Sequence, residues 1–307
     1  MLGTTIAATV LAAQAALAIP VVNYSAETYK PGHGLASLGI GYGMATGSRD
    51  DSGNFKALPN KTGYSKLALP LTLRLGLLDN LEGMIGIPLA MKTATPATGS
   101  AQSSTGIGNV AVSLKYQFLH QAGIPATILS SGSTDAAYGD SMDLSLALYV
   151  DAPTGKTSYD KPDPAKLGTD VTAYNRMDVG AELLTAKRWG AFKLTSNLGY
   201  YYTPETDYPT TKKVAVPGYL SYALSGEYAV MDNAGFMLEL LGGNDLGSTK
   251  VAGVAVPQSQ YYGIMLSPGV QYQPTENLNL ALSCLVSVVG RNNQDSVIPT
   301  LTANYLF

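Results

Sequence analysis

Apolar residues alternate with small or polar residues along most of the chain after residue 34. The clearest run is 66–77, KLALPLTLRLGL, in which a leucine stands at every second position from Leu67 to Leu77. A period of two places alternate side chains on opposite faces of a β-strand, whereas a helix repeats every 3.6 residues. The alternation recurs at 110–118 and 144–150. The pattern therefore predicts an all-β chain whose strands have one apolar and one polar face.

Runs of this kind predict about twelve strands. They fall at 34–46, 63–78, 81–92, 105–118, 141–152, 173–187, 191–203, 217–230, 234–244, 260–273, 277–290 and 297–307. Each is long enough to cross a bilayer, because a tilted transmembrane strand needs about 9 to 11 residues. We therefore predict a transmembrane antiparallel up-and-down β-barrel over residues 34–307.

The links between these strands alternate in length. Those at 79–80, 189–190, 231–233 and 274–276 are short, and most of the others are long and rich in Gly, Pro, Ser, Thr and Asp. Outer-membrane barrels combine short periplasmic turns with long external loops, so both mature termini are expected in the periplasm of a bacterium. The link at 120–140 is long where a turn is expected. It contains either a periplasmic helix around 124–130 or strand structure that the pattern does not reveal.

The N-terminal segment reads as an export signal. Residues 1–18 are apolar and end in Ala16-Leu17-Ala18, the small-x-small pattern of a secretory cleavage site, although no Lys or Arg precedes them. An uncleaved anchor helix is the alternative. Residues 19–33 would then form a periplasmic lead-in or a partial plug of the lumen.

Composition excludes several other classes of protein. Only 13% of residues are charged, against roughly 25% in soluble domains. A formal net charge of -3 provides no basic surface for nucleic acid. The single Cys284 excludes an intramolecular disulfide and a cysteine-cluster metal site; it falls on the apolar stripe of its strand and is expected to face lipid.

Charged residues fall opposite the apolar stripe of their strands. An ionised Arg or Lys on the lipid face at the midplane of a barrel costs about 2 to 4 kcal/mol, so these residues should face the lumen. Lys187 breaks this parity, but it lies beside Trp189 at a tight turn, where a long side chain can reach the interface. The inward charged residues are Lys66, Arg74, Glu82, Lys92, Lys115, Asp143, Asp151, Arg176, Asp178, Glu182, Lys193, Glu227 and Glu239.

The predicted lumen has no strong net sign, since basic and acidic residues are similarly numerous, which argues against a simple ion-selective porin. Apolar and aromatic side chains lie between the charges. They either suit an amphipathic solute or fill space in a narrow barrel. As the pore-lining set we select Lys66, Arg74, Glu82, Lys115, Asp143, Tyr149, Asp178, Glu182, Lys193, Tyr201, Glu227 and Glu239.

Aromatic residues near the strand ends are expected to anchor the barrel in the two interfaces. They are Trp189, Tyr200, Tyr202, Tyr219, Tyr262, Tyr272 and Tyr305. We also expect outer-membrane lipid as a partner. The last strand ends in Phe307, and a terminal aromatic on an alternating strand resembles the signal read by the barrel-assembly machinery.

No arrangement of residues supports catalysis, a metal or a cofactor. The two histidines, His33 and His120, lie near expected periplasmic strand ends, away from the outer leaflet where a barrel lipase would act. Asp160, Asp163 and Asp170 share a loop, yet lysines are interleaved with them, so a solvated loop is favoured over a calcium site. The glycines at 39–43 lie within a strand and cannot cradle a phosphate as a loop before a helix does.

Several stretches together resemble the outer-membrane transporter family named for the meta-pathway of phenol degradation (phenol MetA-type transporters). They are TGIGN at 105–109, VSLKYQF at 112–118, LSLALYVDAPTG at 144–155, SNLGYYY at 196–202 and MLELLG at 237–242. The family pattern is G-x-G-D, and here Asn109 stands in place of the Asp. The resemblance implies an outer-membrane barrel that takes up small, often aromatic or hydrophobic, compounds.

These observations lead to one expected function and two alternatives. The expectation is an outer-membrane channel for passive or facilitated uptake of small solutes. One alternative is a structural or surface-interaction barrel with a closed lumen and binding outer loops. The other is a barrel lipid hydrolase.

Overall fold

A computed structural model describes residues 24–121, 141–158, 163–173, 177–208 and 213–307. The predicted signal segment, the 124–130 helix, Asp160 and Arg176 lie outside these ranges. No helix in the described ranges is long and apolar enough to span a bilayer.

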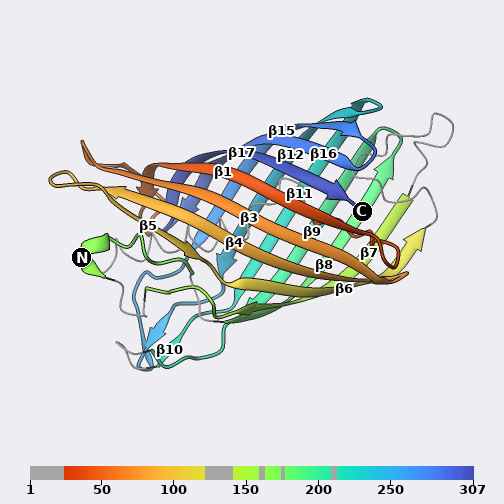
Figure 1. Ribbon diagram of the computed structural model, residues 1–307. Helices are drawn as coiled ribbons and strands as arrows, with labels where there is room; N and C mark the ends of the chain where they lie inside the picture. The colour runs from red at the N-terminus through yellow and green to blue at the C-terminus, as the bar shows by residue number, and fades with distance from the viewer. Residues whose placement is uncertain (1–23, 122–140, 159–162, 174–176, 209–212) are drawn as a thin grey trace.

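Twelve long strands of the described chain form a closed antiparallel barrel, which confirms the predicted fold (Figure 1). Each strand pairs with its neighbours in the chain, and the last strand pairs with the first to close the sheet. The strands are β1 (Gly34–Arg49), β3 (Gly63–Leu78), β4 (Leu81–Thr95), β6 (Val110–Gln121), β7 (Ser141–Ala152), β8 (Asp178–Trp189), β9 (Phe192–Tyr202), β11 (Tyr219–Met231), β12 (Ala234–Asp245), β15 (Tyr262–Thr275), β16 (Leu278–Arg291) and β17 (Gln294–Leu306).

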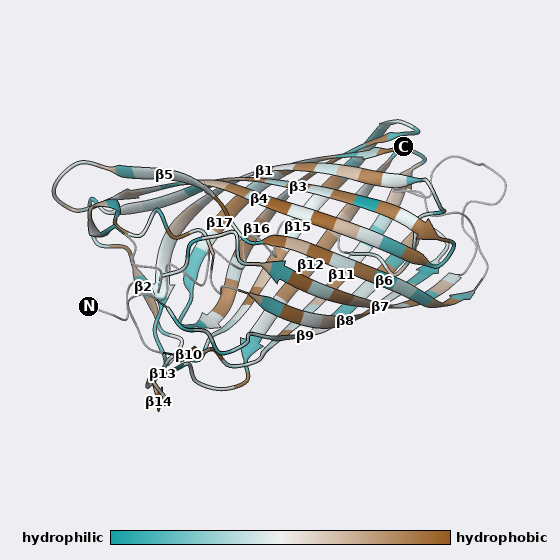
Figure 2. Ribbon diagram, turned by 60° about the horizontal axis from the view of Figure 1, so that its bottom comes forward, coloured by the Kyte–Doolittle hydropathy of each residue, from teal (hydrophilic) through white to brown (hydrophobic). Residues whose placement is uncertain are grey.

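Several short strands lie outside the set of twelve long strands. β2 (Phe55–Ala57) pairs with β1, and β5 (Gln102–Ile107) pairs with β4. β10 (Val214–Ala215), β13 (Lys250–Val251) and β14 (Val254–Ala255) form a separate small sheet, which lies at the end of the barrel opposite the C-terminus (Figures 1 and 2). Strands of two or three residues are too short to produce a periodic pattern, so the sequence did not predict them.

The strand predicted at 105–118 is confirmed from Val110 onward as β6, but its start is wrong, because the chain breaks between β5 and β6 at Gly108 and Asn109. Opposite the break lies Pro88, which has no N–H to offer the ladder. The Gly108 N–H donates to the Pro88 carbonyl at 2.8 Å, and a Cβ on Gly108 would lie 2.9 Å from Pro88 Cγ. Thr154 completes the break, because its hydroxyl donates to the Gly108 carbonyl and accepts from the Val110 N–H.

β8 begins at Asp178 instead of the predicted residue 173. The N–H groups of Thr172 and Ala173 both donate to the Lys156 carbonyl, at 2.7 and 3.0 Å. Residues 172 and 173 are therefore bonded to Lys156 in the preceding loop, where the alternation predicted the start of a strand.

Apolar side chains cover the outside of the barrel, and Figure 2 shows brown and pale residues alternating along the strands. Trp189, Tyr200, Tyr202, Tyr272 and Tyr305 are exposed on this side, where a bilayer would surround them. The Lys187 ammonium lies 5.7 Å from the centre of the Trp189 ring.

The first and last strands meet through a pair of backbone hydrogen bonds at the end of the barrel that has the short turns. We call this end the periplasmic rim, because outer-membrane barrels have their short turns on the periplasmic side. The Gly34 N–H donates to the Phe307 carbonyl at 3.0 Å, and the Phe307 N–H donates back at 3.1 Å. Only glycine fits at position 34, since a Cβ there would lie 2.3 Å from the Arg74 carbonyl oxygen.

The outward face of β16 gives a test of the membrane orientation. Leu282 is exposed and pairs with Val270 and Leu301 on the flanking strands. Leu282→Arg is expected to lower the free energy of unfolding in lipid vesicles by about 2 to 4 kcal/mol, because the charge would enter the hydrocarbon. Leu282→Ala is the matched control, and urea titration measures both variants. Equal losses for the two would contradict a lipid-facing position.

Candidate functional site

All twelve residues selected as pore-lining lie on the inner face of the barrel wall. Their neighbours along each strand point outward and are largely exposed apolar residues. Glu82, Lys115 and Glu239 are almost fully buried, so they are packed within the lumen. The positions are Lys66 and Arg74 on β3, Glu82 on β4, Lys115 on β6, Asp143 and Tyr149 on β7, Asp178 and Glu182 on β8, Lys193 and Tyr201 on β9, Glu227 on β11 and Glu239 on β12. Contact between a solute and these side chains stays a prediction.

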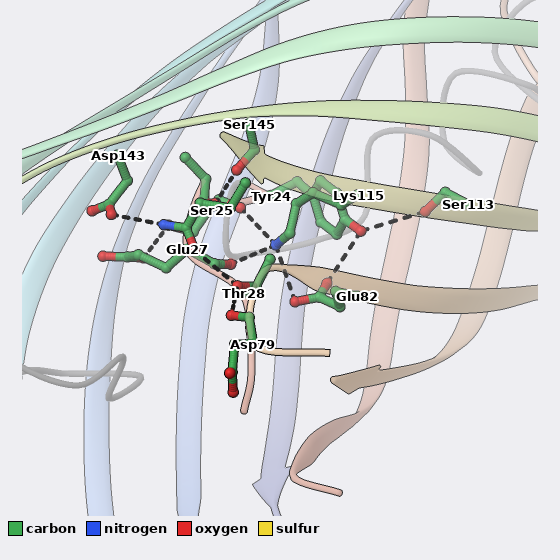
Figure 3. A network of polar contacts seen from close by, with 12 residues as sticks. Tyr24, Ser25, Glu27, Thr28, Asp79, Glu82, Ser113, Lys115, Asp143 and Ser145 are labelled. Carbon is green, nitrogen blue, oxygen red and sulfur yellow. Dashed lines mark hydrogen bonds and ion pairs between the residues drawn. The ribbon is translucent and has the colours of Figure 1, made fainter. Parts of the chain in front are cut away.

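The described part of the N-terminal lead-in lies inside the barrel (Figure 3). The Ser145 hydroxyl of β7 donates to the Ala26 carbonyl, and the Asn197 amide of β9 donates to the Tyr24 carbonyl at 3.1 Å. Ala26 has no exposed surface and packs with Leu184 of β8. Residues 24–30 therefore rest on the wall made by strands β3 to β9.

Tyr24 is held by charged groups on three strands. Its hydroxyl donates to Glu82 Oε1 at 3.2 Å. The Arg74 guanidinium and the Lys115 ammonium lie 4.2 and 4.6 Å from the centre of its ring. Burial is the main cause that raises the pKa of this phenol well above its usual range, so Tyr24 stays neutral and its hydroxyl donates a hydrogen bond to Glu82.

Glu27 forms an ion pair with Lys193 of β9. Its Oε2 lies 2.8 Å from Lys193 Nζ, and the Ser25 hydroxyl donates to the same oxygen. Burial alone would raise the pKa of Glu27, but the charge of Lys193 and these hydrogen bonds outweigh it and lower the pKa to about 2. The carboxylate is therefore ionised at neutral pH.

Lys115 joins the segment to the wall. Its ammonium donates to the carbonyls of Ser25 at 2.9 Å and Glu27 at 2.6 Å, and it lies 3.1 Å from Glu82 Oε2. A buried ammonium with three oxygen partners is well satisfied. The predicted pore-lining residues Glu82, Lys115 and Lys193 thus bind the lead-in.

A second set of contacts lies nearer the periplasmic rim. The Thr28 hydroxyl donates to Gln117 Oε1 at 2.8 Å, and Gln117 Nε2 donates to Asp143 at 2.8 Å. His120 Nδ1 lies 2.6 Å from the same Asp143 oxygen. Gly76 lets the chain enter, because a Cβ there would lie 2.2 Å from the Lys30 carbonyl oxygen.

Tyr219 corrects one sequence prediction, since it lies inside the barrel and not in an interfacial girdle. Its ring centre lies 6.5 Å from that of Tyr201 and 6.3 Å from that of Tyr261, and both of these residues are buried. The sequence could have shown this, because Tyr219 is an even number of positions from the inward Ser225 and Glu227 and so lies on the same face of the strand. No sequence signal identified Tyr24 or Glu27 as lumen residues.

The calcium site considered at 153–170 is not formed by the described residues. Asp170 Oδ2 lies 2.5 Å from Lys156 Nζ. No group of three or more His, Cys, Asp or Glu able to hold a metal occurs within the described ranges.

Asn109, which replaces the Asp of the G-x-G-D pattern, accepts a hydrogen bond through Oδ1 from the Gly155 N–H at 3.1 Å. An amide oxygen and a carboxylate oxygen both accept this bond. The contact seen here therefore needs no charge at position 109.

The Glu27 ion pair predicts how the segment responds to mutation and to pH. Glu27→Gln is expected to speed amide hydrogen exchange at residues 24–30 by about tenfold or more, since a hydrogen bond to a charged group typically contributes about 1.5 to 3 kcal/mol. Exchange is measured by mass spectrometry. Glu276→Gln, on an exposed periplasmic turn, is the matched control.

The pH dependence follows from the lowered pKa. A depressed carboxyl pKa stabilises the bound segment fully above the ordinary pKa of 4.5, and this contribution is lost as the pH falls towards about 2. Protection of residues 24–30, corrected for intrinsic exchange, should hold from pH 7 to about 4.5 and then decline. Loss of protection between pH 7 and 5 would contradict the anchoring role of Glu27.

Comparisons with known proteins agree with this architecture. The solved COG4313 outer membrane channel from Pseudomonas putida F1 matches with a TM-score of 0.72 and 14% identity, covering 94% of this chain and 100% of the other. The transport unit of the autotransporter AIDA-I from Escherichia coli matches with a TM-score of 0.50 and 11% identity, covering 98% of each chain. Both likenesses concern the fold, which is that of a bacterial outer-membrane barrel.

The family of the protein can be assigned from its sequence. No curated protein matches the chain. The model of the family described as "Putative MetA-pathway of phenol degradation" matches residues 65–296, which is most of the barrel. The protein therefore belongs to this family.

Proposed function

We propose that the protein is an outer-membrane channel for passive or facilitated uptake of small hydrophobic or aromatic solutes. The observation that carries the proposal is a closed barrel whose inner face combines charged and hydroxyl groups with apolar and aromatic side chains such as Tyr201, Met237 and Leu285. This face holds residues 24–30 against one side. Such a barrel needs neither covalent chemistry nor an energy source, because the solute moves down its own gradient.

The wall formed by β16 and β17 supports a path beside the segment. Its two charged residues, Arg291 and Asp295, lie at one end of these strands. The rest of the wall is rich in hydroxyl and amide groups, including Asn279, Ser283, Thr300, Thr302 and Asn304. The hydroxyls of Ser283 and Thr302 are buried and have no hydrogen-bond partner among the described residues. Groups of this kind are the ones that water or a polar atom of a solute satisfies.

Three further parts of the proposal concern partners. Lipid of the outer membrane surrounds the exposed apolar stripe, and a small-molecule solute occupies the lumen. The barrel-assembly machinery would recognise β17 and its terminal Phe307, whose ring lies at the rim beside Gly34. No nucleic acid partner is proposed.

Planar-bilayer conductance of the refolded mature chain tests the proposal. We expect discrete current steps in salt, blocked when phenol is added, because an aromatic solute would occupy the conducting lumen. Deleting residues 19–33 should raise the unit conductance, since the segment fills part of the barrel. A loop deletion at 247–249, at the far end of the barrel from the C-terminus, is the control for shortening the chain.

A closed structural barrel is the second candidate, because residues 24–30 occupy part of the lumen. They are held there by the ion pair of Glu27 with Lys193 and by Lys115, which also pairs with Glu82 on the neighbouring strand. In that case the folded full-length chain and the 19–33 deletion would both be silent. Deletion of the outer loops would then abolish the binding function of the barrel, and no solute flux would be seen with or without the loops.

A further inference from the structure

Four tyrosines form a continuous row on the inner wall near the outer end of the barrel. The tyrosine row consists of Tyr149, Tyr201, Tyr219 and Tyr261, with successive ring centres 5.9, 6.5 and 6.3 Å apart. Tyr149 is three residues from the end of β7, Tyr201 is the penultimate residue of β9, and Tyr219 begins β11. The row therefore follows the lumen wall from strand to strand at one level.

Glycines on neighbouring strands let these rings lie against the wall. A Cβ on Gly180 would lie 2.4 Å from Tyr201 Cδ1, and one on Gly243 would lie 1.9 Å from the Tyr219 hydroxyl. A ring that covers a glycine lies along the sheet, so its face is turned to the lumen. Tyr149 and Tyr219 are both partly exposed, and for inward residues this exposure is to the lumen.

Carboxylates border the tyrosine row on both edges. Asp151 and Asp178 pair across β7 and β8 one step outward of Tyr149, and Glu182 lies one step inward on β8. Glu182 Oε2 accepts a hydrogen bond from the Tyr149 hydroxyl at 2.9 Å. Both Glu182 and Asp151 are partly exposed, so acceptor oxygens stand beside aromatic faces.

We propose that the tyrosine row and Glu182 form a subsite for protonated aromatic amines in the outer half of the lumen. The ring of the solute lies against the row between Tyr149 and Tyr219, and its ammonium group donates to Glu182. Tyrosine faces attract cations, and Tyr24 already holds two cationic groups over its ring in this lumen. The inference rests on the proposed channel, and it adds a preference for positive charge.

An isosteric set of probes separates stacking from charge. Phenethylamine, 2-phenylethanol and phenylacetate share a phenyl ring and differ in the charge of the terminal group. Isothermal titration calorimetry on the folded full-length protein in detergent should give the tightest binding for phenethylamine and the weakest for phenylacetate, which the carboxylates repel.

Two variants test which residues cause the expected preference for phenethylamine. Glu182→Gln should weaken phenethylamine binding by about tenfold while leaving 2-phenylethanol unchanged, because only the charged hydrogen bond is lost. Tyr219→Leu should weaken both probes by roughly three- to tenfold, because stacking is lost for each. Glu205→Gln in an outer loop, where Glu205 pairs with Lys213 at 3.4 Å, changes the overall charge equally and serves as the control.

Three results would overturn the subsite. The first is phenylacetate binding as tightly as phenethylamine. The second is a Glu182→Gln variant that keeps the wild-type ratio of amine to alcohol affinity, and the third is folded protein that binds none of the probes. Calorimetry does not depend on transport, so absence of conductance in the bilayer counts against the proposed channel alone. Equal affinities for phenethylamine and phenylacetate in a conducting protein count against the subsite alone.

Discussion

Every backbone N–H and C=O in the hydrocarbon must find a partner within the protein, and this requirement governs the whole structure. An open sheet would leave an edge of unpaired groups, each costly to bury in lipid. The pairing of β17 with β1 removes that edge. Its periplasmic end depends on Gly34, where any side chain would collide with the Arg74 carbonyl. Closure then divides all side chains into those that meet lipid and those that meet the lumen.

The inner set is unusual for a protein interior, because it is charged and yet largely buried. Burying a single charge is costly unless it is paired and hydrogen-bonded. Lys115 meets this condition only with the carbonyls of Ser25 and Glu27 together with Glu82. The lead-in and the wall therefore complement each other electrostatically. Without the lead-in, the buried Lys115 ammonium would lose two of its oxygen partners.

The strands and the sides of their residues could be predicted from the sequence because period two is a local signal. Leu67 to Leu77 identify β3 and its lipid face without knowledge of any other strand. The break at Gly108 could not be predicted this way, since it depends on Pro88 in the neighbouring strand and on Thr154 in a later loop. The partners of Tyr24 are equally non-local, coming from β3, β4 and β6. Tyr219 was misassigned because nearness to a strand end was given more weight than its parity.

The inward charges also have a consequence for how faithfully the strands align. A slip of one residue in the pairing of a strand moves every side chain to the opposite face. For β4 such a slip would turn both Glu82 and Lys92 to the outer face, and for β3 it would turn Lys66 and Arg74 there. Each Lys or Arg moved to the midplane would cost about 2 to 4 kcal/mol. The charges of the lumen thus favour the correct register, because a misregistered barrel would expose them to lipid whether or not a solute is bound.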